Sequence, residues 1–394
     1  MMDKTTQLIH HPYQPPEGYS APQPGVFKAS TIFFPSVAVM RERYKDEIGH
    51  QYTYGTKGTP TTFVLEERLC TLEGGTYCSL VPSGLAAIAL VNFALLHMGD
   101  EVLLPNNVYG PSKTLAEGEL ARFGISYQLY DAMDPADLAA KISAKTKLVW
   151  LEAAGSVTLE FPNLPELVRI CKAKNVLTAL DNTWGAGIAF QPFEQGVDLS
   201  IHALTKYPSG GGDVLMGSVV TRDVALSAQI KHAHMRTGYN VGVNDIETIL
   251  RSLSSLVLRY DAHGAAAHEL AVWCQKRTEI VQVLHPALSG APGHAHWQEV
   301  CTTGQSAGLF SIMLHERFSS AQVDAFCDAL RIFKIGFSWG GPISLVVPYK
   351  VRHMRTLPLP EYLQRGHLVR FSIGLEAVAD LQADLVQAMQ SAFN

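Results

Sequence analysis

The sequence predicts an α/β protein with a mostly parallel central sheet flanked by helices, an N-terminal arm and a smaller α+β region at the C-terminus. Three observations support this fold class. Apolar strand-like segments alternate with helical patterns between residues 78 and 204. Residues 1–60 are instead rich in Pro, Gly, Thr and Tyr, and long helical stretches begin after about residue 245. We therefore expect an extended arm over 1–60, an α/β domain over 61–245 and an α+β domain over 246–394.

Local patterns assign the elements of the alternating region. A helix is expected over 60–72, because Pro60 stands in its first turn, leucines recur at helical spacing, and Gly74 and Gly75 follow it. The strand-like segments are 78–82, 101–105, 125–131, 146–153, 176–181 and 198–204. Helices are expected between them, over 83–99, 111–124, 135–142 and 163–175. Strands and helices that alternate in this way build parallel sheets, and ligands bind at the carboxyl ends of such strands.

The C-terminal part has a different pattern. Residues 244–277 are typical of long helices, and 308–314 and 367–374 are typical of strands. This succession indicates an α+β arrangement.

Composition excludes several classes of partner. Apolar residues make up 47% and charged residues 17% of the 394 residues, which is typical of a compact globular chain. The formal net charge of −5 shows no basic excess, so nucleic acid is not an expected partner. No apolar run is long enough to span a membrane, and the N-terminus lacks the apolar run of a signal peptide. We therefore expect no membrane association.

Cysteine and histidine spacing predicts neither disulfides nor a metal site. The six cysteines are scattered without a CxxC pair, as expected of reduced core residues in a cytoplasmic protein. Fifteen histidines include the pairs His232/His234 and His294/His296, but no HExxH motif or cysteine cluster accompanies them. The sequence thus predicts a cytoplasmic protein without a metal.

A lysine, Lys206, stands directly before a glycine-rich run in the segment TKYPSGGGD, 205–213. A P-loop has its lysine after the glycines, and no GxGxxG motif follows an expected strand, so neither nucleotide-binding motif is present. Taken alone, such a lysine is more often a solvated residue beside a flexible loop. A lysine with its ordinary pKa of ~10.4 is a poor nucleophile, so a catalytic Lys206 must be desolvated or held as an imine.

Two further features end strands at the same edge of the expected sheet. The segment Ser83-Gly84-Leu85 opens a helix, where free N–H groups and the helix dipole can hold an anion, although an ordinary tight turn explains it equally well. Asp181 follows an apolar strand, where a carboxylate is costly to bury unless it is paired. It either caps the next segment or binds a cationic ring nitrogen.

Together these features meet the requirements of pyridoxal 5′-phosphate. The helix start suits the phosphate, Asp181 suits a protonated pyridine nitrogen, and Lys206 suits an imine with the aldehyde. Tyr109 follows the strand 101–105 and is placed to stack on the ring face, although a loop tyrosine is more often a packing residue. The combination favours a catalytic Lys206 over a solvated one.

Motifs along nearly the whole chain support this interpretation. In order they are YGTKGTPT, LEGGTYCSLVPSGLAAI, NNVYGPS, LEAAGSVTLE, LDNTWGAG, TKYPSGGGD, SWGGPISL and VRFSIGLE. They resemble the motifs of the cysteine/methionine-metabolism family of pyridoxal-phosphate enzymes, above all those of the bacterial cystathionine β-lyases. The resemblance implies the fold type I architecture of these enzymes and an active unit of at least two chains, with tetramers usual in the family.

The resemblance also implies roles for individual residues around the cofactor. Lys206 matches the lysine that carries the cofactor, and Asp181 matches the aspartate at the pyridine nitrogen. Tyr109 matches the stacking tyrosine, and in the implied reaction either Lys206 or Tyr109 returns a proton to the leaving sulfur. The main chain of Gly84 and Leu85, with the Thr205 hydroxyl, would hold the phosphate.

The same comparison assigns contacts to the substrate and to a neighbouring subunit. Arg370 matches the arginine that binds the substrate α-carboxylate, and Ser338 and Trp339 match the turn beside the substrate. Tyr54 matches a tyrosine that reaches the phosphate of a neighbouring subunit. Thr56 stands where the family usually has a phosphate-binding arginine, and Lys57 follows it.

Other departures from the family pattern surround the cofactor. Ala203 replaces a frequent phosphate-binding serine, Gly211-Gly212 replaces His-Ser, and Ser156 replaces an asparagine near the cofactor hydroxyl. These departures concern the strength of cofactor binding and not the identity of the cofactor.

The implied reaction is α,β-elimination of L-cystathionine to homocysteine, pyruvate and ammonia. Cystathionine γ-lyase or γ-synthase activity and a broader cysteine-S-conjugate β-lyase remain alternatives, because they use the same machinery. A non-catalytic relative that binds the cofactor is a remote alternative. In every catalytic version the substrate is a small amino acid, and for the lyases it is a thioether.

Overall fold

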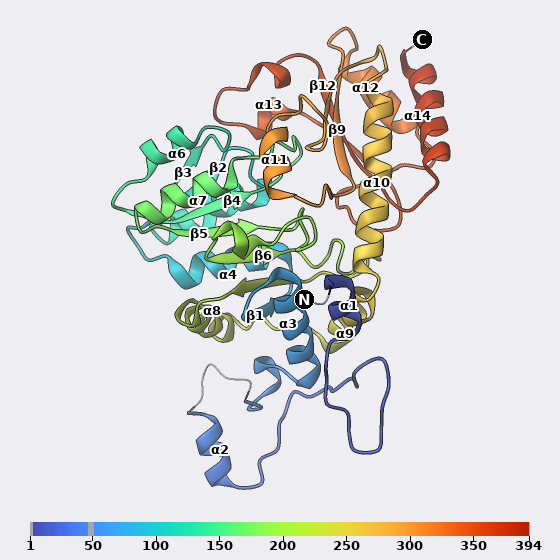
Figure 1. Cartoon of the computed structure of the whole chain (residues 1–394). Helices are drawn as coiled ribbons and strands as arrows, with labels where there is room; N and C mark the ends of the chain where they lie inside the picture. The colour runs from blue at the N-terminus through green and yellow to red at the C-terminus, as the bar shows by residue number, and fades with distance from the viewer. Residues whose placement is uncertain (1–2, 46–50, 394) are drawn as a thin grey trace.

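The computed structural model describes residues 3–45 and 51–393. The body of the protein contains two sheets (Figure 1). The larger sheet has seven strands in the order β1-β7-β6-β5-β4-β2-β3. The smaller has five, in the order β10-β11-β12-β9-β8. The two sheets occupy successive parts of the chain, and the predicted α/β fold class is confirmed.

The large sheet is mostly parallel, as the sequence predicts. Its strands are β1 (Tyr77–Val81), β2 (Glu101–Pro105), β3 (Ser126–Tyr130), β4 (Thr146–Glu152), β5 (Leu177–Asp181), β6 (Leu199–His202) and β7 (Gly217–Thr221). The six expected strands all form, each within two residues of its expected ends. The strands from β3 to β6 pair in parallel, whereas β7 pairs antiparallel with both β1 and β6. Sequence reasoning missed β7, because no helical segment sets it apart from the glycine-rich loop before it.

Helices cover both faces of this sheet (Figure 1). They are α3 (Pro60–Glu73), α4 (Gly84–Leu95), α5 (Gly110–Leu115) with the π-helical turn η2 (Ala116–Leu120), α6 (Pro135–Lys141), α7 (Leu164–Ala173), the short η3 (Pro192–Gln195) and α8 (Val224–Thr237). The expected end of α4 at Gly99 is wrong. Leu96 already has extended dihedral angles, and the Asp100 carboxylate accepts the His97 N–H at 2.7 Å, which holds a turn in place of another helical turn.

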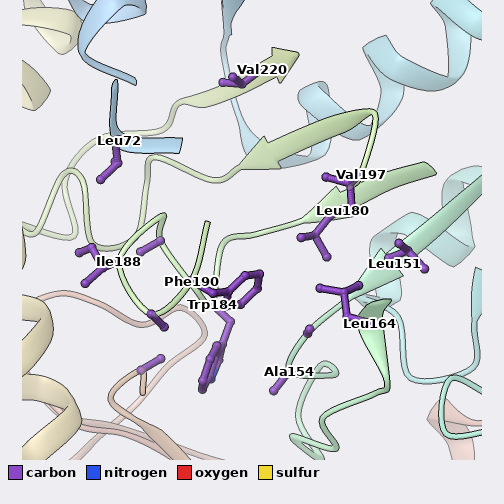
Figure 2. Packing of buried hydrophobic residues seen from close by; sticks show 14 of the residues in the cluster. Leu72, Leu151, Ala154, Leu164, Leu180, Trp184, Ile188, Phe190, Val197 and Val220 are labelled. Atoms are coloured by element: carbon purple, nitrogen blue, oxygen red, sulfur yellow. The ribbon is translucent and has the colours of Figure 1, made fainter. Parts of the chain in front are cut away.

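Buried apolar side chains join the sheet to its helices (Figure 2). Leu151 of β4, Leu180 of β5 and Val220 of β7 share one cluster with Leu72 of α3 and Leu164 of α7. This packing fixes the carboxyl ends of the parallel strands relative to one another, and the candidate functional residues follow those ends.

The C-terminal part packs helices against the five-stranded sheet. Its elements are α9 (Val243–Leu253), α10 (Leu256–Cys274), β8 (Ile280–Leu284), α11 (His294–Val300), β9 (Leu309–Leu314), α12 (Ser320–Ala329), β10 (Lys334–Ile335), β11 (Leu345–Tyr349), α13 (Val351–Met354), η4 (Glu361–Leu363), β12 (His367–Ser372) and α14 (Val378–Phe393). The expected strands 308–314 and 367–374 form as β9 and β12. The helical stretch 244–277 is broken between α9 and α10.

The N-terminal segment leaves the body and returns to it (Figure 1). Its first helix, α1 (Lys4–Ile9), buries Leu8 and packs on α3, and the extended part begins after it. The arm also carries α2 (Val37–Arg43) and the single turn η1 (Gly55–Lys57). Large apolar side chains stay exposed along it: Tyr19, Val26, Phe27, Phe33, Val37, Tyr44, Tyr52 and Tyr54. The domain limits 1–60, 61–245 and 246–394 stay predictions.

Candidate active site

Lys206 lies in the turn that follows β6, at the carboxyl edge of the large sheet. Its main-chain N–H donates to the Ala203 carbonyl at 3.1 Å, which turns the chain back under the side chain. The Nζ atom donates to the Ser338 Oγ at 2.7 Å and lies 5.5 Å from the centre of the Trp339 ring. The structure therefore brings Lys206 together with the two residues of the expected substrate turn.

The surroundings of Lys206 favour its neutral amine. Burial, reinforced by the Arg370 charge, lowers the pKa of Lys206 to about 8, while Asp181 acts in the opposite direction. With this pKa roughly a tenth of Lys206 is free amine at pH 7, far more than for an ordinary lysine, and imine formation or proton abstraction requires the free amine. The alternative of a solvated lysine beside a flexible loop does not fit this environment.

Asp181 is the last residue of β5, directly at the carboxyl edge. Its Oδ1 accepts the Thr183 N–H at 3.0 Å. Burial raises the pKa of Asp181, and the hydrogen bonds from Thr183 and the charges of His202 and Lys206 oppose that rise. Of the two interpretations of Asp181, the cap-like bond is present, and the contact with a cationic ring nitrogen stays a prediction.

Tyr109 stands one loop away, as the residue before α5. Its N–H donates to the Glu152 Oε2 at 2.8 Å, and its side chain is 42% exposed. Burial, Asp181 and Glu152 together raise the pKa of the Tyr109 phenol. The Tyr109 phenol therefore lies within the electrostatic influence of Asp181, and the residue is not fully packed in.

The start of α4 forms a close-fitting cradle for an anion. Ser83 caps the helix by accepting the Ala86 N–H at 3.0 Å, while the N–H groups of Gly84 and Leu85 have no acceptor within the helix. A Cβ atom at Gly84 would lie only 2.7 Å from the Ala203 Cβ, so the close approach requires glycine. The N-terminus of this twelve-residue helix thus suits a phosphate.

Thr205 lies at the same edge, but its hydroxyl already has partners. Its Oγ1 donates to the Met216 carbonyl at 3.3 Å and accepts the Met216 N–H at 3.1 Å. To donate to a phosphate, the hydroxyl must turn away from Met216. Its role in phosphate binding stays a prediction.

Arg370, on β12, faces the site from the small sheet. It is 8% exposed, its Nη2 donates to the Ser338 carbonyl at 3.4 Å, and its guanidinium lies 5.4 Å from the centre of the Tyr349 ring. Its Nε is buried without a hydrogen-bond partner among the described residues. A buried cation with an unused donor is costly, and a substrate carboxylate would satisfy it.

The two arm residues do not join this cluster within one chain. The arm projects away from the sheets (Figure 1), and the Tyr54 side chain is 49% exposed. Tyr54 pairs with Thr31 in an isolated β-bridge, and Thr56 lies in the turn η1 that follows. The contacts expected of Tyr54 and Thr56 with the cofactor of a neighbouring chain stay predictions.

The positions that depart from the family pattern lie close to the site. The Ala203 N–H donates to the Thr183 Oγ1 at 2.9 Å, and the Ser156 N–H donates to the Asn107 carbonyl at 2.9 Å. Gly211 and Gly212 are exposed beside the lysine turn.

Sequence reasoning missed two residues of the site. Glu152 ends β4 as Asp181 ends β5, so the argument that singled out Asp181 applied to it as well. Tyr349, under the Arg370 guanidinium, gave no signal, because only the antiparallel pairing of β11 with β12 brings the two strands together.

The residues present fit pyridoxal 5′-phosphate. The α4 cradle suits the phosphate, Asp181 the ring nitrogen, and the partly desolvated Lys206 the aldehyde. Within residues 3–45 and 51–393, no three His, Cys, Asp or Glu side chains gather as metal ligands would. No helix in that part of the chain combines the length and apolarity that crossing a membrane requires.

Comparison with known proteins agrees with this geometry. The family model of Cys/Met metabolism PLP-dependent enzymes matches residues 5–390. A cystathionine β-lyase of Bordetella avium is 37% identical over 397 residues, which covers 98% of this chain and 97% of the relative. An L-alanine/L-glutamate racemase of Wolbachia pipientis is 31% identical, with 93% of this chain and 92% of the relative covered.

A solved structure extends the comparison to three dimensions. A Campylobacter jejuni protein assigned as an O-acetylhomoserine (thiol)-lyase superposes with a TM-score of 0.91 at 25% identity, covering 99% of this chain and all of the other. That protein contains N′-pyridoxyl-lysine-5′-monophosphate. The match of nearly the whole chain to the family model, together with these relatives, establishes that the chain belongs to the Cys/Met metabolism family of pyridoxal-phosphate-dependent enzymes.

Proposed function

We propose that the protein is a carbon–sulfur lyase that cleaves L-cystathionine by α,β-elimination. The observation that carries this proposal is the position of the Lys206 amine. It lies between the Ser338 hydroxyl and the Trp339 ring, and the charge of Arg370 helps to lower its pKa. A partly desolvated base thus stands next to a buried, incompletely paired binder of carboxylates.

The chemistry divides between cofactor and protein. When bound, pyridoxal 5′-phosphate supplies a protonated ring that accepts the electron pair released when the Cα–H bond breaks. Lys206, as a free amine, takes the Cα proton, and the Ser338 hydroxyl holds that amine in place at 2.7 Å. Asp181 keeps a negative charge at the ring nitrogen. These roles need a neutral lysine and an ionised aspartate in the same site.

Arg370 orients the substrate. Its guanidinium binds the α-carboxylate, which fixes the Cα–H bond relative to Lys206. The thiolate of homocysteine leaves from Cβ and takes a proton from Lys206 or from the Tyr109 hydroxyl. Water then hydrolyses the remaining three-carbon fragment to pyruvate and ammonia, so the atoms of cystathionine and one water are accounted for.

The rival activities use the same residues. A γ-lyase or γ-synthase removes a second proton, at Cβ, and places the substrate differently against Trp339. A broader β-lyase acts on cystine or S-alkylcysteines with the same set of groups. A cofactor-binding protein without activity would have no use for the unpaired Arg370 Nε.

Product analysis separates these possibilities. Purified, cofactor-loaded protein is incubated with L-cystathionine, and pyruvate with homocysteine is the expected pair. Cysteine with 2-oxobutyrate would instead indicate γ-elimination. In a separate incubation with L-alanine, formation of D-alanine would indicate racemisation. Lys206→Ala should abolish the reaction, whereas Lys141→Ala, at a half-buried ion pair with Asp137 on α6, should keep it.

We also propose that the active unit is a homo-oligomer, a tetramer in full assembly. The exposed apolar side chains of the arm and its projection away from the sheets support this proposal. Tyr54, with Thr56 or Lys57, would then reach the phosphate in a neighbouring chain. A Tyr54→Phe chain and a Lys206→Ala chain should complement each other when mixed, because one site per pair regains both groups. Failure to complement would place Tyr54 in its own chain's site.

Location and domain limits complete the proposal. We propose a cytoplasmic enzyme with an arm over 1–60, a cofactor domain over 61–245 and a C-terminal domain over 246–394. The lack of bonded cysteine pairs among the described residues supports a reducing compartment.

A further inference from the structure

A second carboxyl group lies beside Asp181 at the floor of the site. Glu152 ends β4 as Asp181 ends β5, and the two residues are direct partners in the parallel register of these strands. Register partners on neighbouring strands point to the same face of the sheet, about 4.8 Å apart along the hydrogen-bonding direction. Glu152 is 8% exposed. Two carboxyl groups therefore share one poorly solvated corner.

Hydrogen bonds and nearby cations stabilise the ionised form of Asp181 more than that of Glu152. Asp181 accepts the Thr183 N–H and lies within reach of the charges of His202 and Lys206. Glu152 accepts the Tyr109 N–H at 2.8 Å, and the described residues give it no other hydrogen-bond donor. The mechanism above uses Asp181 and leaves Glu152 without a role.

Two further charges act on Glu152 in opposite directions. Arg355, from the segment after α13, lowers its pKa, and Glu160, on the loop after β4, raises it. The Arg355 guanidinium lies 3.8 Å from the Glu160 carboxylate and also donates to the Asn106 carbonyl at 2.7 Å. Because Arg355 is already matched by Glu160, it offers little net positive charge to Glu152.

Two adjacent buried carboxyl groups cannot both ionise at low cost. The group whose ionised form is less stabilised by hydrogen bonds and cations keeps its proton. Burial and the neighbouring Asp181 raise the pKa of Glu152 well above its ordinary range. Burial raises the pKa of Asp181 as well, but its hydrogen bonds and the nearby cations oppose that shift. The proton shared by the pair therefore resides on Glu152.

We propose that Glu152 is a positioning residue that stays protonated, holds the main chain of Tyr109, and leaves a single negative charge, on Asp181, for the cofactor ring nitrogen. A second negative charge there would attract protons to neighbouring groups and make the desolvated pair costly to bury. A neutral acid can still accept the Tyr109 N–H through its carbonyl oxygen, so Glu152 fixes the stacking ring without adding charge. The inference rests on cofactor binding and not on which C–S bond is cleaved.

The first test measures the proton directly, on cofactor-free full-length protein. Infrared spectroscopy in D₂O at neutral pH should show the carbonyl stretch of a protonated carboxylic acid, and Glu152→Gln should remove it. Glu101→Gln is the matched control. Glu101 is equally buried, at 6% exposed, but it accepts hydrogen bonds from Gln128, Ser143 and Thr146 that stabilise its anion, so the band should survive. An unchanged band in Glu152→Gln would overturn the proposal.

The second test separates the charge from the hydrogen bond, in cofactor-loaded protein without substrate. Glu152→Gln keeps a neutral acceptor for the Tyr109 N–H, so the pH midpoint of the cofactor's visible absorbance should not move. Glu152→Ala loses the acceptor, and cofactor should bind about tenfold more weakly, as expected for one buried hydrogen bond. A shifted midpoint in Glu152→Gln, or equal cofactor affinity in the two variants, would refute the assignment whatever the substrate proves to be.

Discussion

The Lys206 Nζ donates a 2.7 Å hydrogen bond to the Ser338 Oγ, although the two residues are 132 positions apart in the chain. Lys206 follows β6 of the large sheet, and Ser338 lies between β10 and β11 of the small one. Ser338 has φ 109°, a conformation that costs energy for any residue other than glycine. The bond therefore couples the two parts of the body at the proposed catalytic amine, at the expense of local strain.

Ser338→Ala should lower kcat about tenfold, because the amine loses the acceptor that holds it in place. Cofactor content, measured from absorbance, should be retained. Ser338→Gly supplies the matched comparison, since it also removes the hydroxyl but relieves the strained φ. In Ser338→Gly, kcat should fall by the same factor as in Ser338→Ala, but the thermal midpoint should be higher than that of Ser338→Ala. Equal midpoints would show that no strain is stored at this position.

Arg370→Lys should raise KM for the amino-acid substrate about 30-fold, since an ammonium cannot reproduce the two-pronged contact of a guanidinium with a carboxylate. Steady-state kinetics at saturating cofactor measure this change. Arg352→Lys, at an exposed arginine that donates to the Gln364 carbonyl, is the control and should leave KM within about twofold. A KM unchanged in Arg370→Lys would move the carboxylate site elsewhere.

The lowered pKa of Lys206 predicts a stability difference that depends on pH. The unfolded chain binds a proton at this lysine below its ordinary pKa of 10.5, whereas the folded, cofactor-free protein binds it only below about 8. Between these values the unfolded state holds more protons, so stability at this site rises with pH from 8 to 10.5 and stays at its lowest below 8.

Lys206→Met removes this dependence. Cofactor-free Lys206→Met should therefore have a higher thermal midpoint than the cofactor-free parent at pH 7, and the gap should shrink at about pH 10. Lys206→Arg keeps its charge at both pH values and should be the less stable of the two variants throughout. A gap that is constant between the two pH values would mean that Lys206 is not desolvated.

The buried ion pair between Arg355 and Glu160 should matter more than a pair on the surface. Its side chains are 4% and 5% exposed, with 3.8 Å between the charged atoms. Arg355→Met leaves the Glu160 carboxylate buried without its cation, so it should lower the free energy of unfolding by about 3 kcal/mol. Adding Glu160→Gln should recover part of that loss.

The exposed pair of Arg365 with Glu361 is the control for this prediction. Its side chains are 73% and 82% exposed, so Arg365→Met should cost less than about 1 kcal/mol. Chemical denaturation monitored by fluorescence compares the four proteins. Similar losses in Arg355→Met and Arg365→Met would mean that water reaches the buried pair.

The fold class could be predicted from local patterns in the sequence. Pro60 and Gly74 delimit α3, and the apolar run of β2 stands between turn residues, so both elements form where they were expected. The missed strand β7 has no such signal, since its place between β1 and β6 depends on pairing with strands far away in the chain. The end of α4 was misplaced because Asp100 stabilises a turn that competes with the helix.

By itself, the sequence predicted which groups would serve the cofactor, because Lys206, Asp181 and the start of α4 each follow a strand and parallel strands present their ends at one edge. Only the tertiary structure decided the pKa values and hydrogen bonds of those groups. The pairing of β4 with β5 puts Glu152 beside Asp181, and the return of the small sheet brings Ser338 and Arg370 to Lys206. The physical reason is that pKa values and hydrogen bonds depend on distance and burial in space, which local sequence patterns do not encode.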